Sequence, residues 1–328
     1  MKRDPQHLLF GLSVQQYSLK GLNMLCILYA GSLVFAALSS PVFFKLVHES
    51  EAFGSFLSLF GEGVVPYLKE KPLTRHFDRA RLLAVIVILP LLFKYAKLYS
   101  LKAVGFRRPF SQFPIWYAYG LGMMVIVLAA TTFSSALSPV PDWSFEMQAK
   151  ATASAVIGAT LLSLFEEVIF RGLVFRLFYS FLKPIPAILL SSLFFGSLHF
   201  KMDPSLMSHI PAAEIGFDDG FRVALGYVTA VADGFTIIHF INYCLVGIIL
   251  HQVFILSGNL WSAIGLHAGW VTVLLSLNKT FEATENTNVF TGSNRVIDGY
   301  WVTIVMSLFV AFFAYLLHKR RSAAPETD

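Results

Sequence analysis

Eight long apolar runs divide the sequence, and each has about the length of a helix that crosses a lipid bilayer. The hydrocarbon core of a bilayer is about 30 Å thick, and about 20 helical residues span it. In lipid, a helix pairs its own backbone N–H and C=O groups within one segment. The sequence therefore predicts an all-α fold, a polytopic transmembrane helical bundle of about eight spans, at residues 22–47, 82–98, 113–133, 152–179, 185–200, 235–256, 260–277 and 300–318.

The balance of residue types agrees with membrane insertion and argues against nucleic-acid binding. Hydrophobic residues make up 56% of the 328 residues and charged residues only 14%, whereas soluble domains carry roughly 25% charged residues. The formal charge of +5 comes from short basic clusters between apolar runs, not from a basic stripe. Cys26 and Cys244 both fall inside predicted spans, so no disulfide framework or thiolate metal site is expected. Because no break in composition occurs, we expect one membrane domain over residues 1–328.

Basic residues between the runs predict how the bundle is oriented. Lys and Arg gather in the cytoplasmic loops of membrane proteins. Residues 94–108 include five Lys or Arg and no acid, and residues 318–321 read His-Lys-Arg-Arg. Both segments are predicted to be cytoplasmic, and an eight-span count then places the N-terminus there as well. Arg75, Arg79 and Arg81 lie on the predicted outer side and argue against this count.

Two adjacent carboxylates and a guanidinium interrupt the apolar stretch 161–172. Each ionisable group near the centre of a membrane helix costs about 2.5 to 3.5 kcal/mol on insertion scales, so three within six residues indicate a functional site. Glu167 and Arg171 are four residues apart and are expected to pair on one helix face. Glu166 is rotated by about 100° from Glu167, which leaves it as the carboxylate available for chemistry. The structural alternative is a buried ion triad that fixes helix packing.

A histidine in the next run lies at the same predicted depth as Glu166. The two runs form a hairpin that turns near Lys183 and Pro184; Glu166 lies 17 residues before Lys183, and His199 lies 15 residues after Pro184. At about 1.5 Å per residue, the difference in depth is only about 3 Å. A Glu and a His that meet inside a membrane suit general-base activation of water, although a lone His in an apolar helix is more often a core residue.

His267 is the third candidate. Its run contains four small residues that allow close helix packing and favour a side chain facing the bundle interior: Ala263, Gly265, Ala268 and Gly269. His267 lies nine residues beyond the turn at Gly258. If the two hairpin turns are level, it sits about 10 to 12 Å closer to the cytoplasm than Glu166. A turn that dips into the membrane would close that gap.

Two further histidines, His239 and His251, compete for the same role. They are twelve residues apart in one run, which places them about 120° apart around the helix and about three turns apart in depth. They therefore cannot both join one site.

Together these residues resemble the CPBP (Abi) family of intramembrane proteases, which includes the CAAX prenyl endopeptidases. The resemblance rests on Glu166-Glu167-x-x-x-Arg171, then Phe195-x-x-x-His199, then His267 in a helix of small residues. It implies a catalytic core at residues 113–277. It also implies that Glu166 is the general base, His199 its partner and His267 the oxyanion-side residue, with Glu167, Arg171 and Phe195 in support.

The chain departs from the family pattern at one position. Well-studied members have Asn or Asp four residues after the third-motif His, where this chain has Val271. The oxyanion donor is then incomplete or comes from another group, such as Asn242 or Asn259. Losing one such donor typically costs about 10² to 10³ in rate.

The resemblance implies an intramembrane endopeptidase in which a Glu/His-activated water cleaves a membrane-associated or exported protein. It further implies no cofactor, a protein or peptide substrate in the lipid bilayer, and an integral protein of a bacterial inner (plasma) membrane. Glu166, His199 and His267 would also make a three-ligand zinc set, so a zinc-dependent membrane protease stays open. The other alternative is a non-catalytic membrane protein, a transporter or a binding scaffold, that uses the charged cluster for proton coupling or structure.

Overall fold

The computed structural model describes residues 21–322 with gaps at 22, 97, 99, 108, 142–143, 201–206, 208–209, 234–236 and 294–295. Most described residues are helical, and six of the described helices are long and apolar enough to cross a membrane. The all-α prediction is confirmed, and a polytopic bundle fits these helices. The described chain divides into two compact units, which are taken in turn below: residues 98–199 with 236–328, and residues 15–97 with 200–235.

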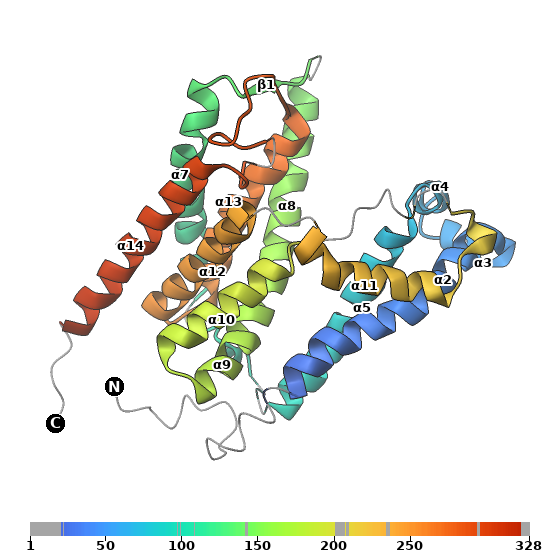
Figure 1. Cartoon of the computed structure of the whole chain (residues 1–328), viewed down its shortest axis with the longest axis horizontal. Helices are drawn as coiled ribbons and strands as arrows, with labels where there is room; N and C mark the ends of the chain where they lie inside the picture. The colour runs from blue at the N-terminus through green and yellow to red at the C-terminus, as the bar shows by residue number, and fades with distance from the viewer. Residues whose placement is uncertain are drawn as a thin grey trace. The chain divides into compact units, whose positions relative to one another are not determined.

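The first unit is a bundle of long helices (Figure 1). Its elements in chain order are α6 (Leu101–Val104), α7 (Gln112–Phe133), β1 (Leu137–Pro139), α8 (Phe145–Ile169), a π-helical turn η3 (Phe170–Val174), α9 (Phe175–Phe181), α10 (Pro184–Ser197), α12 (Ile237–Ser257), α13 (Leu260–Thr280), β2 (Phe281–Ala283) and α14 (Tyr300–Ser322). Strand β1 follows α7, strand β2 follows α13, and the two strands pair antiparallel.

Helix α13 is the central helix of this bundle and packs mainly on α7 and α8. Small residues explain the close approach: a Cβ atom at Gly265 or Gly269 would collide with backbone carbonyls of Phe113 and Tyr117 on α7. This is the packing that small residues permit in membrane helices, where backbone contact replaces side-chain interdigitation. The prediction that this stretch faces the bundle interior is confirmed, since its residues 262–270 are all buried.

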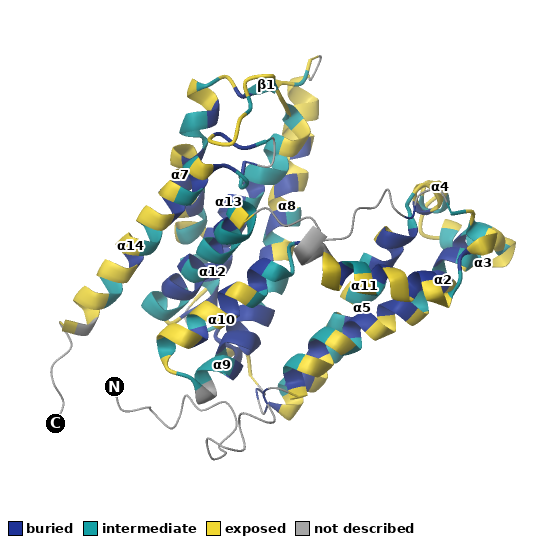
Figure 2. Ribbon diagram, viewed as in Figure 1, coloured by how far each residue is buried: buried dark blue, intermediate teal, exposed yellow. Residues whose placement is uncertain are grey.

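The outer face of the bundle is apolar. Val125 on α7, Ile157 on α8 and Leu308 on α14 each expose more than 60% of their surface, and Figure 2 shows exposed residues along the outer side of α14. A surface of this kind suits lipid rather than water, because contiguous apolar patches are rare on soluble monomers.

The second unit holds η2 (Ile27–Gly31), α2 (Ser32–Glu49), α3 (Glu51–Ser58), α4 (Val64–Lys69), α5 (Leu73–Tyr95), η5 (Ala212–Glu214) and α11 (Phe217–Asp233). Helix α2 packs along α5 and α11 around a core of Leu33, Phe44, Phe77 and Val223. Ser50 ends one helix and begins the next, because its side chain accepts a hydrogen bond from Phe53 N and so caps α3.

The prediction of eight spans is not confirmed by the helices of the described residues. The predicted span 82–98 forms the end of α5, whose last 18 residues contain Asp78, Arg79, Arg81 and Lys94, so it does not qualify as a long apolar segment. The predicted span 185–200 forms α10, which is apolar but only 14 residues long. This helix runs from Pro184 to Ser197 and is therefore shorter than the about 20 residues that cross a bilayer.

Candidate active site

Glu167 and Arg171 form the buried core of the site. Arg171 Nη1 lies 2.9 Å from Glu167 Oε1, and both side chains are fully buried. The predicted pair is therefore present. Arg171 Nη2 also donates to the Gly247 carbonyl of α12 at 3.0 Å, and its guanidinium lies over the Phe195 ring, 5.3 Å from the centroid. The predicted supporting residues thus tie α8 to α10 and α12.

Arg171 lies in η3, where one turn of π-helix follows α8. A π-helical turn inserts an extra residue into the helix and is frequent at functional sites. All five residues of the turn are buried. At Gly172 an added Cβ atom would meet the Val104 side chain at 3.1 Å, so a small residue is needed for the close approach of the segment before α7.

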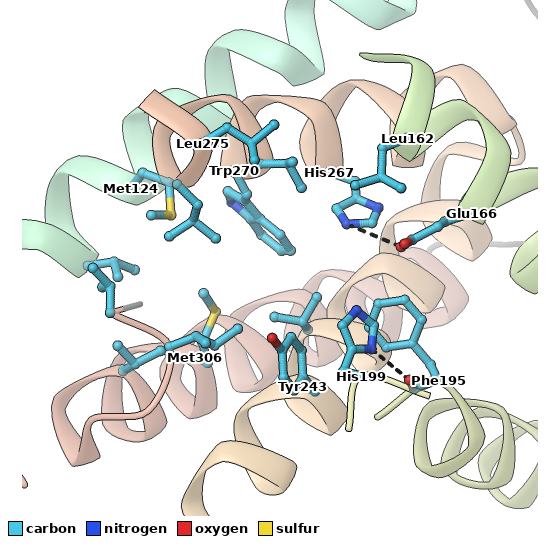
Figure 3. A pocket seen from close by; sticks show the side chains of 17 residues that line it. Met124, Leu162, Glu166, Phe195, His199, Tyr243, His267, Trp270, Leu275 and Met306 are labelled. Carbon is cyan, nitrogen blue, oxygen red and sulfur yellow. Dashed lines mark hydrogen bonds and ion pairs between the residues drawn. The ribbon is translucent and has the colours of Figure 1, made fainter. Parts of the chain in front are cut away.

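Glu166 points elsewhere, as its rotation from Glu167 predicts. Its side chain keeps 20% of its exposure and lines a cavity of about 210 Å³. Its Oε2 atom lies 3.8 Å from His267 Nε2, and Figure 3 shows the carboxylate beside the His267 ring at the cavity wall. Of the two adjacent carboxylates, Glu166 is the one that a substrate in the cavity can reach.

His267 lies between the two glutamates, which corrects the depth expected from level turns. Its Nδ1 atom donates to Glu167 Oε1 at 2.9 Å, and its Nε2 atom faces Glu166. The expected offset of about 10 to 12 Å is therefore wrong. The two turns that flank these helices are not level.

Arg176 explains this offset of the turns. Its guanidinium donates to the carbonyls of Ala103 and Val104, and the next residues of that segment bind the turn between α12 and α13: Leu260 N donates to Gly105 O at 2.9 Å, and Arg107 N donates to Asn259 Oδ1 at 3.2 Å. Arg176 lies seven residues before Lys183, which corresponds to about 10 Å of helix. The turn between α12 and α13 is thus held about 10 Å deeper in the bundle than the turn near Lys183, which accounts for the offset expected between His267 and Glu166.

His199 follows the end of α10 and lines the same cavity as Glu166 and His267. Its Nδ1 atom donates to the Phe195 carbonyl at 2.8 Å, and its ring lies between two aromatic rings, with centroids 4.5 Å from Phe195 and 4.0 Å from Tyr243. Figure 3 shows His199 across the cavity from Glu166 and His267. Glu166 and His199 thus line one cavity, and their direct meeting at one depth stays a prediction.

The rest of the cavity is mostly apolar. Away from Glu166 it extends between α7, α12, α13 and α14 and the loop before α14, and its wall consists of Met124, Val127, Leu162, Phe195, Tyr243, Val246, Trp270, Val271, Leu274, Leu275, Val296, Ile297, Val302 and Met306. Such a cavity, with a few polar groups at one end, is typical of a site that binds an apolar ligand and orients it through those groups.

The rival histidines lie outside this wall. His251 is fully buried, and its ring contacts the Gly247 carbonyl and the hydroxyl of Ser191 at 2.5 and 3.0 Å, so it is a hydrogen-bonded core residue. His239 stacks on Tyr243 with centroids 4.8 Å apart. Neither belongs to the residues that line the cavity.

The two asparagines suggested as replacement donors are also committed elsewhere. Asn242 Nδ2 donates to the Ile297 and Gly299 carbonyls at 2.6 and 3.2 Å and so holds the loop before α14. Asn259 accepts from Arg107 N at the turn before α13. Val271 does line the cavity, one helical turn beyond His267. The donor expected from either asparagine is therefore not at the site.

Tyr243 and Trp270 line the cavity and carry hydrogen-bonding groups, and the sequence pattern did not single them out. Tyr243 lies four residues after His239 in an apolar helix, and only its phenol group distinguished it from lipid-facing aromatics. A search for hydroxyl-bearing side chains on the same face as Gly247 and Val246 would have found it.

The donors of the site do not converge as a metal centre in the part of the chain that the structure describes. Among those residues, no group of three or more His, Cys, Asp or Glu side chains is arranged to hold a metal ion. Both Nδ1 atoms of His199 and His267 are hydrogen-bonded to oxygen. The zinc-dependent alternative therefore stays a prediction.

A helical membrane bundle with a carboxylate and two imidazoles on an apolar cavity has the features of a membrane-embedded enzyme. Residues 148–273 match the family model described as Type II CAAX prenyl endopeptidase Rce1-like. Residues 148–273 are therefore a domain of the CPBP family, which indicates a peptidase, a hydrolase of peptide bonds. The matched segment includes every candidate site residue from Glu166 to His267. No curated protein and no solved structure matches the chain significantly.

Proposed function

We propose that the chain cleaves a membrane-associated or exported protein with a water that Glu166 activates. The proposal rests on the different surroundings of the two adjacent carboxylates. Glu167 is fully buried and bonded to Arg171 and His267, whereas Glu166 lines the cavity beside the His267 imidazole, with His199 across the cavity. A carboxylate in low-dielectric surroundings, within reach of a water in the cavity, is suited to general-base catalysis.

The reaction balances with the groups present. Glu166 takes one proton from water, and the hydroxide oxygen bonds to the carbonyl carbon of the scissile peptide. His199 orients that water through Nε2, because Nδ1 carries the proton donated to Phe195 O. The proton on Glu166 then moves to the amide nitrogen, the C–N bond breaks, and a carboxylate and an amine are released.

Glu167, Arg171 and Phe195 act as positioning residues in this proposal. Glu167 accepts from His267 Nδ1 and fixes the ring with Nε2 toward Glu166. This resembles the way in which a buried carboxylate orients a histidine in other hydrolases. The oxyanion-side role of His267 requires a proton on Nε2, and therefore an imidazolium, since Nδ1–H is already used.

We further propose that residues 113–277 are the catalytic core, that the reaction needs no metal, and that the substrate is an exported or anchored protein. The match to the Rce1-like family model supports the second point, and the positive-inside reading of the loops supports the third. Cleavage that persists in metal chelators is expected. Cysteine labelling that places residues 201–233 in the cytoplasm would contradict the exported substrate.

The test compares protein termini in membrane and secreted fractions from cells that carry the wild-type chain or Glu166→Gln at matched abundance. Termini that appear only with the wild type are expected, and purified Glu166→Gln should lose at least about 10²-fold in cleavage rate. Glu146→Gln is the matched control, because Glu146 lies on the same helix in an exposed pair with Lys150. Equal termini from wild type and Glu166→Gln would favour a binding or transport role.

A further inference from the structure

Trp270 on α13 carries a buried N–H group at the wall of the cavity. The residue is 3% exposed, and its indole Nε1 has no hydrogen-bond partner among the residues that the structure describes. Of the buried side-chain polar atoms without a partner in that part of the chain, Nε1 is the only one that belongs to a residue lining the cavity. An indole N–H can only donate, and it usually finds an acceptor when the ring is buried. This exception therefore calls for an explanation.

A second indole shows what such a group binds in this bundle. Trp301 Nε1 on α14 donates to the carbonyls of Ile126 and Val127 on α7, at 3.3 and 3.0 Å. Main-chain carbonyls are suitable partners, because each has two lone pairs and a helical hydrogen bond uses only one of them. Trp270 has the same donor at the cavity wall, where a carbonyl group of a bound molecule can take the same place.

Met124 controls access to this N–H. Figure 3 shows the indole nitrogen on the side of the ring toward Met124, which also lines the cavity, and away from Glu166. Met124 on α7 is 2% exposed, and Nε1 itself is buried from solvent. A Met side chain is unbranched and rotates about three bonds, so it adapts readily to a ligand. A carbonyl oxygen at this end of the cavity can therefore reach Nε1 when Met124 changes its rotamer.

A peptide bound for hydrolysis brings carbonyls that need such a donor. The attacked bond must lie in an extended segment, and extension frees the carbonyls that a helix would pair internally. Leaving a carbonyl unpaired in apolar surroundings costs free energy. The cavity wall away from Glu166 is mostly apolar. The unpaired N–H of the wall and an unpaired carbonyl of the substrate can thus satisfy each other.

We propose that Trp270 Nε1–H donates a hydrogen bond to a main-chain carbonyl next to the cleaved bond and so holds an extended, apolar segment of the substrate in the cavity. This carbonyl is not the attacked one, because Nε1 lies on the side of the indole away from Glu166. Trp270 is in this sense a substrate-binding residue that sets the register of the substrate relative to Glu166. No bond to it forms or breaks. The proposal rests on the peptidase function given above.

The test combines a change at position 270 with a change in the substrate carbonyl. The variant carries 3-benzothienylalanine at position 270, which keeps the shape of the indole and has sulfur in place of the N–H. The substrate is a peptide that spans a cleavage site found in the comparison of termini. With this peptide, KM is expected to rise about 5- to 100-fold while kcat stays within about threefold of wild type, because a uniform binding contact is lost.

Ester peptides then identify the carbonyl. Each peptide bond that flanks the cleaved bond is replaced in turn by an ester, whose carbonyl is a weaker acceptor. With the wild type, one ester position should raise KM at least about threefold. With the variant, the same ester should change KM by less than about 1.5-fold, since the donor is already absent. Equal ester effects in the two proteins at every position would overturn the proposal. A fall in kcat of about 10² at unchanged KM would also overturn it, because the N–H would then serve the attacked carbonyl.

Trp261 provides the matched control, since it lies on the same helix and is not among the residues that line the cavity. Its ring packs against Phe106 and Phe110, with centroids 4.8 and 4.9 Å apart. 3-Benzothienylalanine at position 261 should leave KM, kcat and every ester effect as in wild type. Trp270→Phe removes the N–H with a smaller ring and should lose the same ester effect as the 3-benzothienylalanine variant.

Glu166→Gln distinguishes the failure of this proposal from failure of the proposed function. If Glu166→Gln is inactive and the ester effects do not depend on Trp270, the peptidase mechanism stands and the role of Trp270 is refuted. If Glu166→Gln yields the same termini as wild type, the proposed function is refuted and this proposal fails with it.

Discussion

Each unit of the molecule contains a cluster of paired charged and polar side chains, fully buried in the first unit and half-buried in the second, and the two clusters differ in what their charges contact. In the second unit, Tyr227 donates its phenol hydrogen to Asp78, and the Arg81 guanidinium lies over the rings of Tyr29 and Tyr227, 5.2 and 5.5 Å from their centroids. In the first unit, Glu167 Oε1 is instead paired with both Arg171 Nη1 and His267 Nδ1, each at 2.9 Å. Only there does a further carboxylate, Glu166, line the cavity described above.

The comparison shows that burial of charge does not by itself define an active site. Burial lowers the pKa of Arg81 and raises the pKa of Tyr227, and both groups remain paired within their cluster. The distinguishing feature of the first unit is a titratable group next to the paired ones that faces a cavity. The predictions below test whether the cluster of the second unit serves only stability, whereas the cluster of the first unit also serves the reaction.

The largest expected effect is on folding, from Arg171→Met. The change leaves the carboxylate of Glu167 buried without its cation, which typically costs about 3 to 5 kcal/mol. We expect little folded protein by size-exclusion chromatography in detergent, in contrast to Glu166→Gln. Lys150→Met is the control, because its exposed pair with Glu146 contributes at most about 1 kcal/mol. Normal accumulation of Arg171→Met would mean that the triad does not hold the bundle together.

A smaller effect is expected from Tyr227→Phe in the second unit. The variant removes the donor to Asp78 and should lower the free energy of unfolding by about 1 to 3 kcal/mol. Cleavage per folded molecule should stay at the wild-type rate. Thermal unfolding and specific activity on the same sample check both points. Lost activity at unchanged stability would place the second unit in the reaction and remove the contrast between the clusters.

The smallest effect concerns His76 at the start of α5. The pKa of His76 is lowered to about 4, chiefly by burial and with a smaller contribution from nearby Arg79 and His48, against a hydrogen bond from its ring to Pro72 O that raises it. The unfolded chain therefore binds a proton before the folded chain does, and stability falls as the pH drops from about 6.5 to about 4. In His76→Phe, the thermal unfolding midpoint should fall by a few degrees less than in wild type over this pH range. The exposed His318→Gln should not differ from wild type, and equal pH slopes for His76→Phe and wild type would contradict the prediction.

Sequence reasoning was sufficient for features set by local geometry. Apolar run lengths predicted the helical membrane class, and a spacing of four predicted the Glu167–Arg171 pair. The rotation between adjacent residues predicted that Glu166 would face elsewhere. These features depend on rise and rotation per residue, which are nearly constant in any α-helix.

The tertiary structure decided what depends on how helices are offset and packed. The contact of His267 with Glu167 requires the turn before α13 to sit deep in the bundle, where Arg176 and the segment near Gly105 hold it. The place of Tyr243 beside His199 likewise depends on how α12 packs against α10. Run lengths carry no information on the relative depth of separate helices, because that depth is set by hydrogen bonds and contacts between residues far apart in the chain.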